Sequence, residues 1–204
     1  IYCRRADAVM TFSHKDKVLL ERQYGLSGIY VLNPYFGIED GMIGVPECQK
    51  KERNTLCFLG QMGREENVAA AIRLIGLGEQ LKNSGYPVKI LIVGNNPPPE
   101  LRRLESDTVH ITGFVEDVDA YVLKSGIAVF PLTLGAGIKL KVLRSIALGT
   151  PVVTTDIGAE GIDEEGSVLL LAKTESEFVR TIADIINMGD KDYFDLCRNG
   201  QEYA

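Results

Sequence analysis

Along most of the chain, short runs of apolar residues alternate with longer segments in which apolar residues recur every three to four positions. Short apolar runs are typical of buried strands, and the longer period is typical of helices that bury one face. From residue 55 onward, strands are predicted at 55–59, 88–93, 109–113, 127–130, 151–154 and 168–171. Helices are predicted at 67–82, 98–104, 118–124, 138–148 and 175–188. Because helical segments separate the strands, the pattern predicts an α/β fold with a Rossmann-like, doubly wound parallel sheet.

The first 34 residues show the same alternation on a smaller scale. Residues 6–12 and 29–32 are predicted to form strands. Between them, Ser13 is predicted to cap a helix, because Asp16 stands at the third helical position as in a weak capping box. That helix is expected to end at Gly25, since glycine readily adopts the left-handed conformation that closes many helices.

Changes in this pattern divide the chain into four parts. A stretch without any period, containing Gly, Pro and charged residues, separates the first block from the regular alternation. The parts are a remnant of a preceding domain with its crossover at 1–34, a linker at 35–54, a Rossmann-like domain at 55–190, and the start of a truncated C-terminal helix at 191–204. Because the chain begins without Met and stops within a helical pattern, we expect it to be a piece of a longer protein.

The composition narrows the classes of function. With 22 Lys and Arg against 28 Asp and Glu, the net charge of −6 argues against a general nucleic-acid binder. The four cysteines stand far apart and form no C-x-x-C pair, so no zinc site is expected and the thiols fit a reducing cytosol. No apolar run reaches about 18 residues, the length that a bilayer-spanning helix needs. We therefore expect a cytoplasmic protein, and leave open that the parent chain associates peripherally with the inner face of a membrane.

In an open parallel sheet, ligands bind outside the carboxyl ends of the strands, so the loops that follow strands are the candidate sites. The first such loop contains Gly60, Gln61 and Gly63, followed by Arg64. Its glycines let the backbone approach a ligand, and the free N–H groups at the next helix start suit an anion. A plain turn and helix cap stays open as the alternative, because the two glutamates that follow suit a helix N-terminus.

The second loop, within residues 130–141, carries more candidate chemistry. A glycine-rich stretch follows a strand, and the next helix has Lys139 and Lys141 in its first turn. A cation at a helix N-terminus costs about 0.3–1 kcal/mol, and a bound anion reverses this cost because lysines and free N–H groups then face one negative group. Lys141 and Arg144, three residues apart, are predicted to share the face opposite the buried one. We favour a phosphate site here over an exposed basic face.

The third loop, residues 154–161, follows the next strand. Its glycines around Glu160 predict an ordered loop at the same edge of the sheet, which alone indicates no chemistry. No catalytic role is assigned to either histidine. His14 is expected at the surface at a helix start, and His110 at a core or edge position in a strand.

In this order, the loops resemble the C-terminal, nucleotide-binding domain of the retaining GT-B glycosyltransferases of family 4, the glycosyl transferases group 1 type. The most specific stretch is G-A-G-I-K-L-K-V-L-x-x-I-A-L-G-T-P-V-V-T-T at 135–155. Shorter matching stretches are C-F-L-G at 57–60 with Asn67, I-L-I-V-G at 90–94, and I-T-G-F-V at 111–115. The likeness covers about residues 55–190, and A-D-A-V-M-T-F-S-H at 6–14 with V-L-N-P at 31–34 resembles the end of that family's N-terminal domain.

The resemblance implies a site for the nucleoside diphosphate of an activated sugar. The backbone at Phe114 and Val115 would meet the base. The residues implied around the diphosphate are Gly60, Gln61, Arg64, Gly135, Ala136, Gly137, Ile138, Lys139, Lys141 and Arg144. Preorganised N–H groups, together with Lys139 or Lys141, would stabilise the leaving diphosphate, so neither a metal nor a tightly bound cofactor is expected.

The implied activity is transfer of a sugar from a nucleoside-diphosphate sugar to an unknown sugar, lipid or protein acceptor, in polysaccharide or glycolipid biosynthesis. The acceptor site and any catalytic group of the missing N-terminal domain would lie outside this sequence, so the fragment alone is expected to be inactive. Two alternatives stay open: a non-catalytic relative that binds a nucleotide or a partner, and a nucleotide-sugar epimerase, which shares the two-domain architecture.

Four positions depart from the family pattern. Arg144 and Ala136 stand where the family places the two acids of its E-x7-E motif, the second of which contacts the donor ribose. Gln61 and Glu66 stand where the family commonly carries Arg and Lys for the diphosphate. An arginine donates to hydroxyls and phosphates, but it cannot accept from a ribose hydroxyl as a carboxylate does. These departures keep the non-catalytic alternative open.

Overall fold

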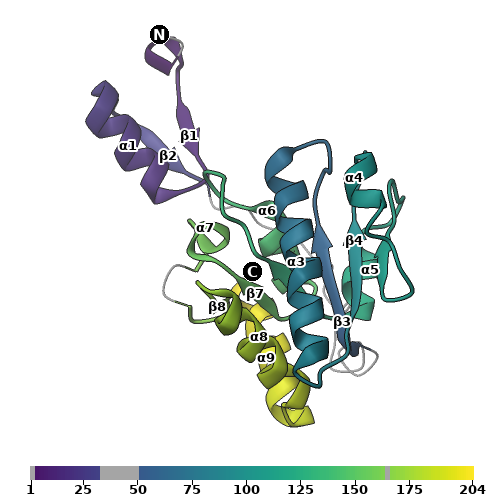
Figure 1. The fold of residues 1–204 in the computed structure, drawn as a ribbon. Helices are drawn as coiled ribbons and strands as arrows, with labels where there is room; N and C mark the ends of the chain where they lie inside the picture. The colour runs from purple at the N-terminus through teal and green to yellow at the C-terminus, as the bar shows by residue number, and fades with distance from the viewer. Residues whose placement is uncertain (1–2, 33–50, 164–165) are drawn as a thin grey trace.

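The computed structural model describes residues 3–32, 51–163 and 166–204. Its centre is a six-stranded sheet in which all neighbouring strands run parallel (Figure 1). The strands, in sheet order, are β5 (Val109–Ile111), β4 (Lys89–Val93), β3 (Glu52–Leu59), β6 (Ser125–Phe130), β7 (Val152–Thr154) and β8 (Leu170–Leu171). The predicted α/β fold with a parallel sheet is confirmed.

Helices cover both faces of this sheet. The long helices are α3 (Glu65–Asn83), α6 (Leu140–Ala147), α8 (Glu175–Asn187) and α9 (Asp190–Tyr203), and the short ones are α4 (Pro99–Arg102), α5 (Asp119–Lys124) and α7 (Asp156–Ala159). Helices α3 and α8 pack against each other and against the sheet, whereas α5 and α6 contact the central strands and α9 packs on α6. Parallel crossovers are right-handed, so their helices change face where the chain reverses its direction along the sheet, between β5 and β6.

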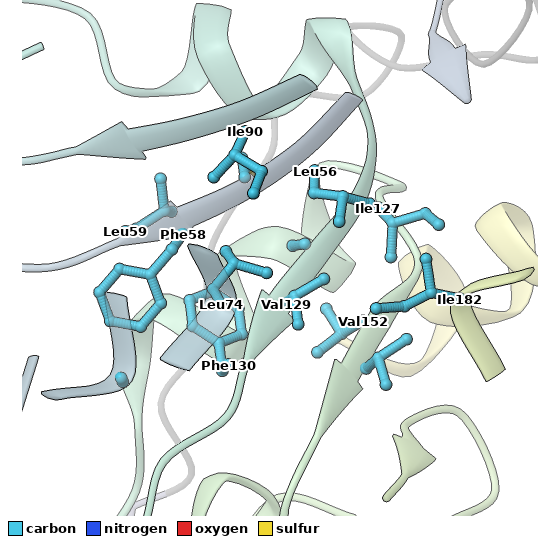
Figure 2. Close-up of a cluster of buried hydrophobic side chains, with 14 of the residues drawn as sticks. Leu56, Phe58, Leu59, Leu74, Ile90, Ile127, Val129, Phe130, Val152 and Ile182 are labelled. Carbon is cyan, nitrogen blue, oxygen red and sulfur yellow. The ribbon is translucent and has the colours of Figure 1, made fainter. Parts of the chain in front are cut away.

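The two central strands are buried on both faces. Every residue of β6 is buried, and Leu56 and Phe58 of β3 have no exposed surface. Figure 2 shows these side chains meeting Leu74 of α3 and Phe130 of β6 in one cluster. The rings of Phe58 and Phe130 lie 5.7 Å apart between centroids. Strands covered on both faces are continuous apolar runs in the sequence, which explains why the apolar pattern predicts them.

Helix α6 begins at Leu140, two residues after the predicted start at Ile138, because Lys139 is the extended residue that precedes the first helical turn. The helix ends at Ala147, and the turn that follows requires a glycine at position 149. Gly149 has a φ of 64°, in the left-handed region. A Cβ atom there would also lie 2.9 Å from the side chain of Gln201, so the turn lets α9 approach closely.

The N-terminal residues form a small unit set apart from the main sheet (Figure 1). Strands β1 (Val9–Thr11) and β2 (Ile29–Val31) pair in parallel, and α1 (His14–Tyr24) connects them. Ser13 caps α1 by accepting a hydrogen bond from a first-turn N–H group at 3.0 Å, and Gly25, with a φ of 59°, ends the helix. The predicted capping residue and helix end are both confirmed.

Strand β3 begins at Glu52, three residues before the predicted start and within the last part of the predicted linker at 35–54. Residues 33–50 lie outside the described residues, but residues 52–54 belong to β3. These three residues are polar and continue the strand beyond the apolar core, so no apolar pattern marks them. Glu52 pairs with Ser125 before a shift in register separates this extension from the buried part of β3.

The predicted loop at 154–161 contains a further element that the sequence did not indicate. Helix α7 spans four residues there, and Thr155 caps it by accepting a hydrogen bond from the Gly158 N–H group. So short a helix has no measurable period, and therefore it escapes pattern analysis. The other helix and strand ends lie within three residues of their predicted positions.

Helix α9, predicted as a helical start at 191–204, begins at Asp190 and packs against the sheet domain. The Tyr193 hydroxyl donates a hydrogen bond to the carbonyl of Gly126 at 2.8 Å, and the Arg53 guanidinium lies 4.4 Å from the centroid of the Tyr193 ring. Among the described helices, none combines the length and the apolar character that crossing a membrane requires.

Candidate functional site

The candidate site lies at the carboxyl ends of β3 and β6, in the middle of the sheet. The chain leaves β3 toward β4 on one side, and it leaves β6 toward β7 on the other. The two loops therefore diverge to opposite faces, and open α/β sheets bind ligands in the crevice outside the strand ends at such a point. Both loops are glycine-rich, as the sequence analysis noted.

The loop after β3 is held in place by Asn67 in the first part of α3. The Asn67 amide donates a hydrogen bond to the Gln61 carbonyl at 2.9 Å. A Cβ atom on Gly60 would lie 2.9 Å from the Asn67 side chain, so glycine permits this close contact. The side chains of Gln61 and Arg64 are exposed at the loop surface. The loop thus leaves both side chains open to solvent, and the Arg64 guanidinium lies 3.8 Å from the Glu66 carboxylate.

Lys141 reaches across the crevice from α6 to the same asparagine. Its Nζ donates to Asn67 Oδ1 at 2.5 Å and lies 4.6 Å from the centroid of the Phe58 ring. Burial lowers the pKa of Lys141 to about 8; Glu66 opposes this shift, whereas the positive charges of Lys139 and Arg64 add to it. Lys139 and Arg64 are therefore both near enough to repel the Lys141 ammonium.

Lys139 folds back over its own loop. Its Nζ donates to the Gly137 carbonyl at 2.6 Å and lies 3.6 Å from Oε2 of Glu160. Gly135 and Gly137 both have positive φ values, 130° and 71°, and a Cβ on Gly135 would lie 3.1 Å from Lys139 Cε. The glycines therefore allow the lysine to lie flat against the loop, with its side chain 12% exposed.

The rest of the loop after β6 is open to solvent. Ala136 is exposed, and Ile138 is half-buried against Gly161. A cavity of about 410 Å³ borders this loop and is lined by Lys15, Gly135, Asp156, Ile157 and Glu160. The N-terminal unit thus contributes Lys15 to the wall of the cavity beside the glycine loop.

Arg144 lies in a different environment from Lys141. Its guanidinium makes a two-pronged pair with Asp119 of α5, at 2.6 and 3.0 Å, and this hydrogen bonding raises the pKa of Arg144. Lys141 is largely buried, whereas the Arg144 side chain is 44% exposed. Lys141 and Arg144 stand three positions apart on α6, but their charged groups lie apart because the long lysine side chain turns inward onto the aromatic rings.

Phe114 and Val115 follow β5, at the same edge of the sheet. Phe114 is 72% exposed, and Val115 is packed partly against the core. The turn that directs Phe114 outward contains Gly113, whose φ is 72°. The exposed ring is thus available to a planar ligand at the carboxyl ends of the strands.

Sequence reasoning missed two side chains that organise this site, Asn67 as the partner of Lys141 and Glu160 as the partner of Lys139. Within the described residues, no group of His, Cys, Asp and Glu side chains has a metal-binding arrangement. What these loops offer is two ammonium groups, a guanidinium and the glycine-rich backbone that leads into α3 and α6, which together are suited to binding an anion with several phosphate oxygens.

A comparison with protein families decides the classification of this domain. The model described as glycosyl transferases group 1 matches residues 53–188, two thirds of the chain. The chain belongs to the glycosyl transferases group 1 family. The resemblance carried by the glycine-rich stretch at 135–155 is thereby confirmed. Among curated proteins, none matches this family member significantly.

Solved structures similar to this family member share its fold. TarM of S. aureus, solved with UDP and α-GlcNAc-glycerol, superposes with a TM-score of 0.78 at 14% identity over 99% of this chain. HepE of Anabaena, solved with UDP and glucose, gives 0.74 at 15% identity over 98% of this chain. Sucrose-phosphate synthase of Thermosynechococcus elongatus gives 0.71 at 18% identity over 97% of this chain.

The chain spans about half the length of these structures, namely 42% of TarM, 59% of HepE and 53% of sucrose-phosphate synthase. At these identities the likeness shows the GT-B fold, and the family match shows a glycosyltransferase domain.

Proposed function

We propose that this chain is the donor-binding half of a glycosyltransferase that transfers a sugar from a nucleoside-diphosphate sugar to an acceptor. The observation that carries the proposal is the clustering of three cations beside two glycine loops, since Lys139 and Arg64 both lie close enough to lower the pKa of Lys141. Glu160 beside Lys139 and Glu66 beside Arg64 offset part of this positive charge, and a bound diphosphate would offset the remainder.

The chemistry follows from where charge develops. Breaking the bond between the anomeric carbon and the phosphate oxygen leaves negative charge on the departing diphosphate. Loop N–H groups around Gly137, with Lys139 and Lys141, would stabilise that charge without a metal ion. We further propose that transfer proceeds with retention of the anomeric configuration, as the family resemblance implies, and that no tightly bound cofactor takes part.

The base and the ribose would lie toward β5, where Phe114 is exposed beside Val115. Two of the similar structures, TarM and HepE, were solved with UDP, which makes UDP the first nucleotide to test. The acceptor would be a sugar, a lipid or a protein bound mainly by the missing N-terminal domain, so we expect this chain alone to be inactive. We place the parent protein in the cytoplasm, in polysaccharide or glycolipid biosynthesis.

A second candidate, a non-catalytic relative that binds a nucleotide or a partner, is favoured by one observation. Arg144 and Ala136 stand at the two motif positions where the family has carboxylates for the donor ribose and sugar, and Arg144 is paired with Asp119 instead. A protein of this kind would bind a nucleotide without turnover even when its N-terminal domain is supplied.

Titration calorimetry with UDP, GDP and their sugars tests the proposal. We expect binding of one nucleotide in the micromolar to millimolar range, and its loss when Lys139 and Lys141 are both replaced by alanine. The matched control is Lys89→Ala with Lys124→Ala, which removes the same charge from two exposed lysines that pair with Glu52. The absence of binding to every nucleotide by a folded wild-type protein would refute donor binding.

A further inference from the structure

We propose that Glu160 is a positioning residue for the diphosphate site, and that through Lys15 it couples this site to the N-terminal unit. The inference rests on the proposed function, because it concerns the same glycine loop. Glu160 directly follows α7, in a segment for which the sequence indicated no chemistry.

The Glu160 carboxylate contacts three groups from two distant parts of the chain. It forms an ion pair with Lys15 of α1, lies 3.6 Å from Nζ of Lys139, and accepts a hydrogen bond from the Gly137 N–H group. The ion pair with Lys15 leads the causes that lower the pKa of Glu160, so the carboxylate is charged at neutral pH. Its side chain is 17% exposed, and solvent therefore screens these contacts less than at an open surface.

Close packing around Gly161, the residue after Glu160, brings the same two parts of the chain together. Gly161 has a φ of 71°, and a Cβ there would lie 2.9 Å from Ile138 Cγ1 and 3.2 Å from Ser13 Cβ. Residues 13–15 and residues 137–139 therefore approach the pair Glu160–Gly161 from two sides. A displacement of the N-terminal unit would be transmitted to the glycine loop through this pair.

A carboxylate beside an anion site has two opposing effects. Its charge repels a bound diphosphate, but its contacts hold Lys139 and the Gly137 N–H group in one arrangement. If the Glu160 carboxylate is removed, Lys139 still donates to the Gly137 carbonyl, but no negative charge at position 160 then offsets its repulsion by Lys141. We expect the positioning of Lys139 and the loop to affect affinity more than the repulsion by Glu160, because a loop that is already ordered loses less conformational entropy when the ligand binds.

The replacement Glu160→Gln separates the two effects, because they predict opposite results. If positioning dominates, the variant binds pyrophosphate and UDP about five- to tenfold more weakly than the wild type. If charge alone matters, removing a negative group tightens the binding of both ligands. The matched control is Glu21→Gln, which makes the same change at the glutamate that pairs with Lys17 elsewhere on α1, and it should leave both affinities unchanged.

Lys15→Met, in the wild type and in Glu160→Gln, tests the coupling. Lys15 is 67% exposed, so this change is expected to leave the fold intact even if Glu160→Gln unfolds the protein. We expect Lys15→Met to weaken pyrophosphate and UDP binding in the wild type and to add nothing when Glu160 is already glutamine. Unchanged affinity in the wild-type background, or a full additive loss in the double variant, would overturn the coupling.

The two proposals fail in distinguishable ways. If the folded wild type binds neither pyrophosphate nor any nucleoside diphosphate at millimolar concentration, donor binding itself is refuted. If the wild type binds and Glu160→Gln binds equally or more tightly, donor binding stands and the positioning role of Glu160 is refuted.

Discussion

Replacing Lys141 with methionine should stabilise the folded protein and at the same time weaken diphosphate binding. The Lys141 ammonium is largely buried, and it lies 4.6 Å from the Phe58 ring and 5.7 Å from the Phe130 ring. Methionine fills similar space and contacts aromatic rings favourably without a charge to desolvate. The buried charge of the lysine therefore lowers the free energy of unfolding, whereas the uncharged methionine has no such effect.

The magnitude follows from the pKa. Burial lowers the pKa of Lys141 from 10.5 to about 8, which at about 1.36 kcal/mol for each tenfold change in proton affinity costs about 3 kcal/mol at neutral pH. Methionine also leaves Asn67 Oδ1 without the hydrogen bond from Lys141, a loss of about 1 kcal/mol. The net gain in the free energy of unfolding should therefore be about 2 kcal/mol at pH 7.

The stability difference between Lys141→Met and the wild type should depend on pH. Between about pH 8 and 10.5, the unfolded lysine binds a proton that the folded lysine has lost, so the stability of the wild type rises with pH. The advantage of Lys141→Met should shrink from about 2 kcal/mol at pH 7 to about zero near pH 10. Urea denaturation of both proteins at several pH values measures the difference, and Lys89→Met, at an exposed lysine, serves as the control.

The reasoning fails if Lys141→Met is less stable than the wild type at pH 7, because the buried ammonium would then be stabilising. It also fails if the difference between the two proteins is the same at pH 7 and pH 10, since the lysine would then titrate alike in both states. A more stable variant that binds UDP as tightly as the wild type would remove Lys141 from the diphosphate site.

Arg144→Glu should keep the protein folded and lower its free energy of unfolding by about 1–2 kcal/mol, because the side chain is exposed, its pair with Asp119 is lost and the new carboxylate repels Asp119. Urea denaturation measures this, and loss of soluble protein would show that this face of α6 is buried. UDP binding near pH 8.5 should take up protons, because a bound diphosphate raises the pKa of Lys141 from about 8. Calorimetry in two buffers of different ionisation enthalpy detects the uptake, which should vanish in Lys141→Met.

Most of the fold could be predicted because its strands are marked by what buries them. The apolar runs of β3 and β6 are covered on both faces, and the helices between them bury one face each. The polar start of β3 at residues 52–54 and the four residues of α7 carry no such pattern. Hydrogen bonds rather than apolar burial specify these two segments, and the pairing of Glu52 with Ser125 is visible only in three dimensions.

The candidate site was predictable as a set of loops but not as a set of contacts. The glycines and lysines at 135–141 indicate a candidate anion site from helix-terminus chemistry alone. The partners of the lysines come from far along the chain, since 74 residues separate Lys141 from Asn67 and 145 separate Lys15 from Glu160. Helical spacing places the Cβ of Lys141 near that of Arg144, but it says nothing about where four further methylene groups carry the ammonium.

The arrangement of these cations depends on the order of the strands. Lys141 is held by Asn67 after β3, Lys139 by Glu160 after β7, and Arg144 by an aspartate after β5. Helix α6 supplies or adjoins all three cations, yet each partner belongs to the segment after a different strand. Changing a cation therefore alters the charge of the crevice, whereas changing a partner alters its geometry at nearly constant positive charge. Measured separately, the two kinds of substitution distinguish attraction of the diphosphate from its orientation, which a lysine replacement alone cannot do.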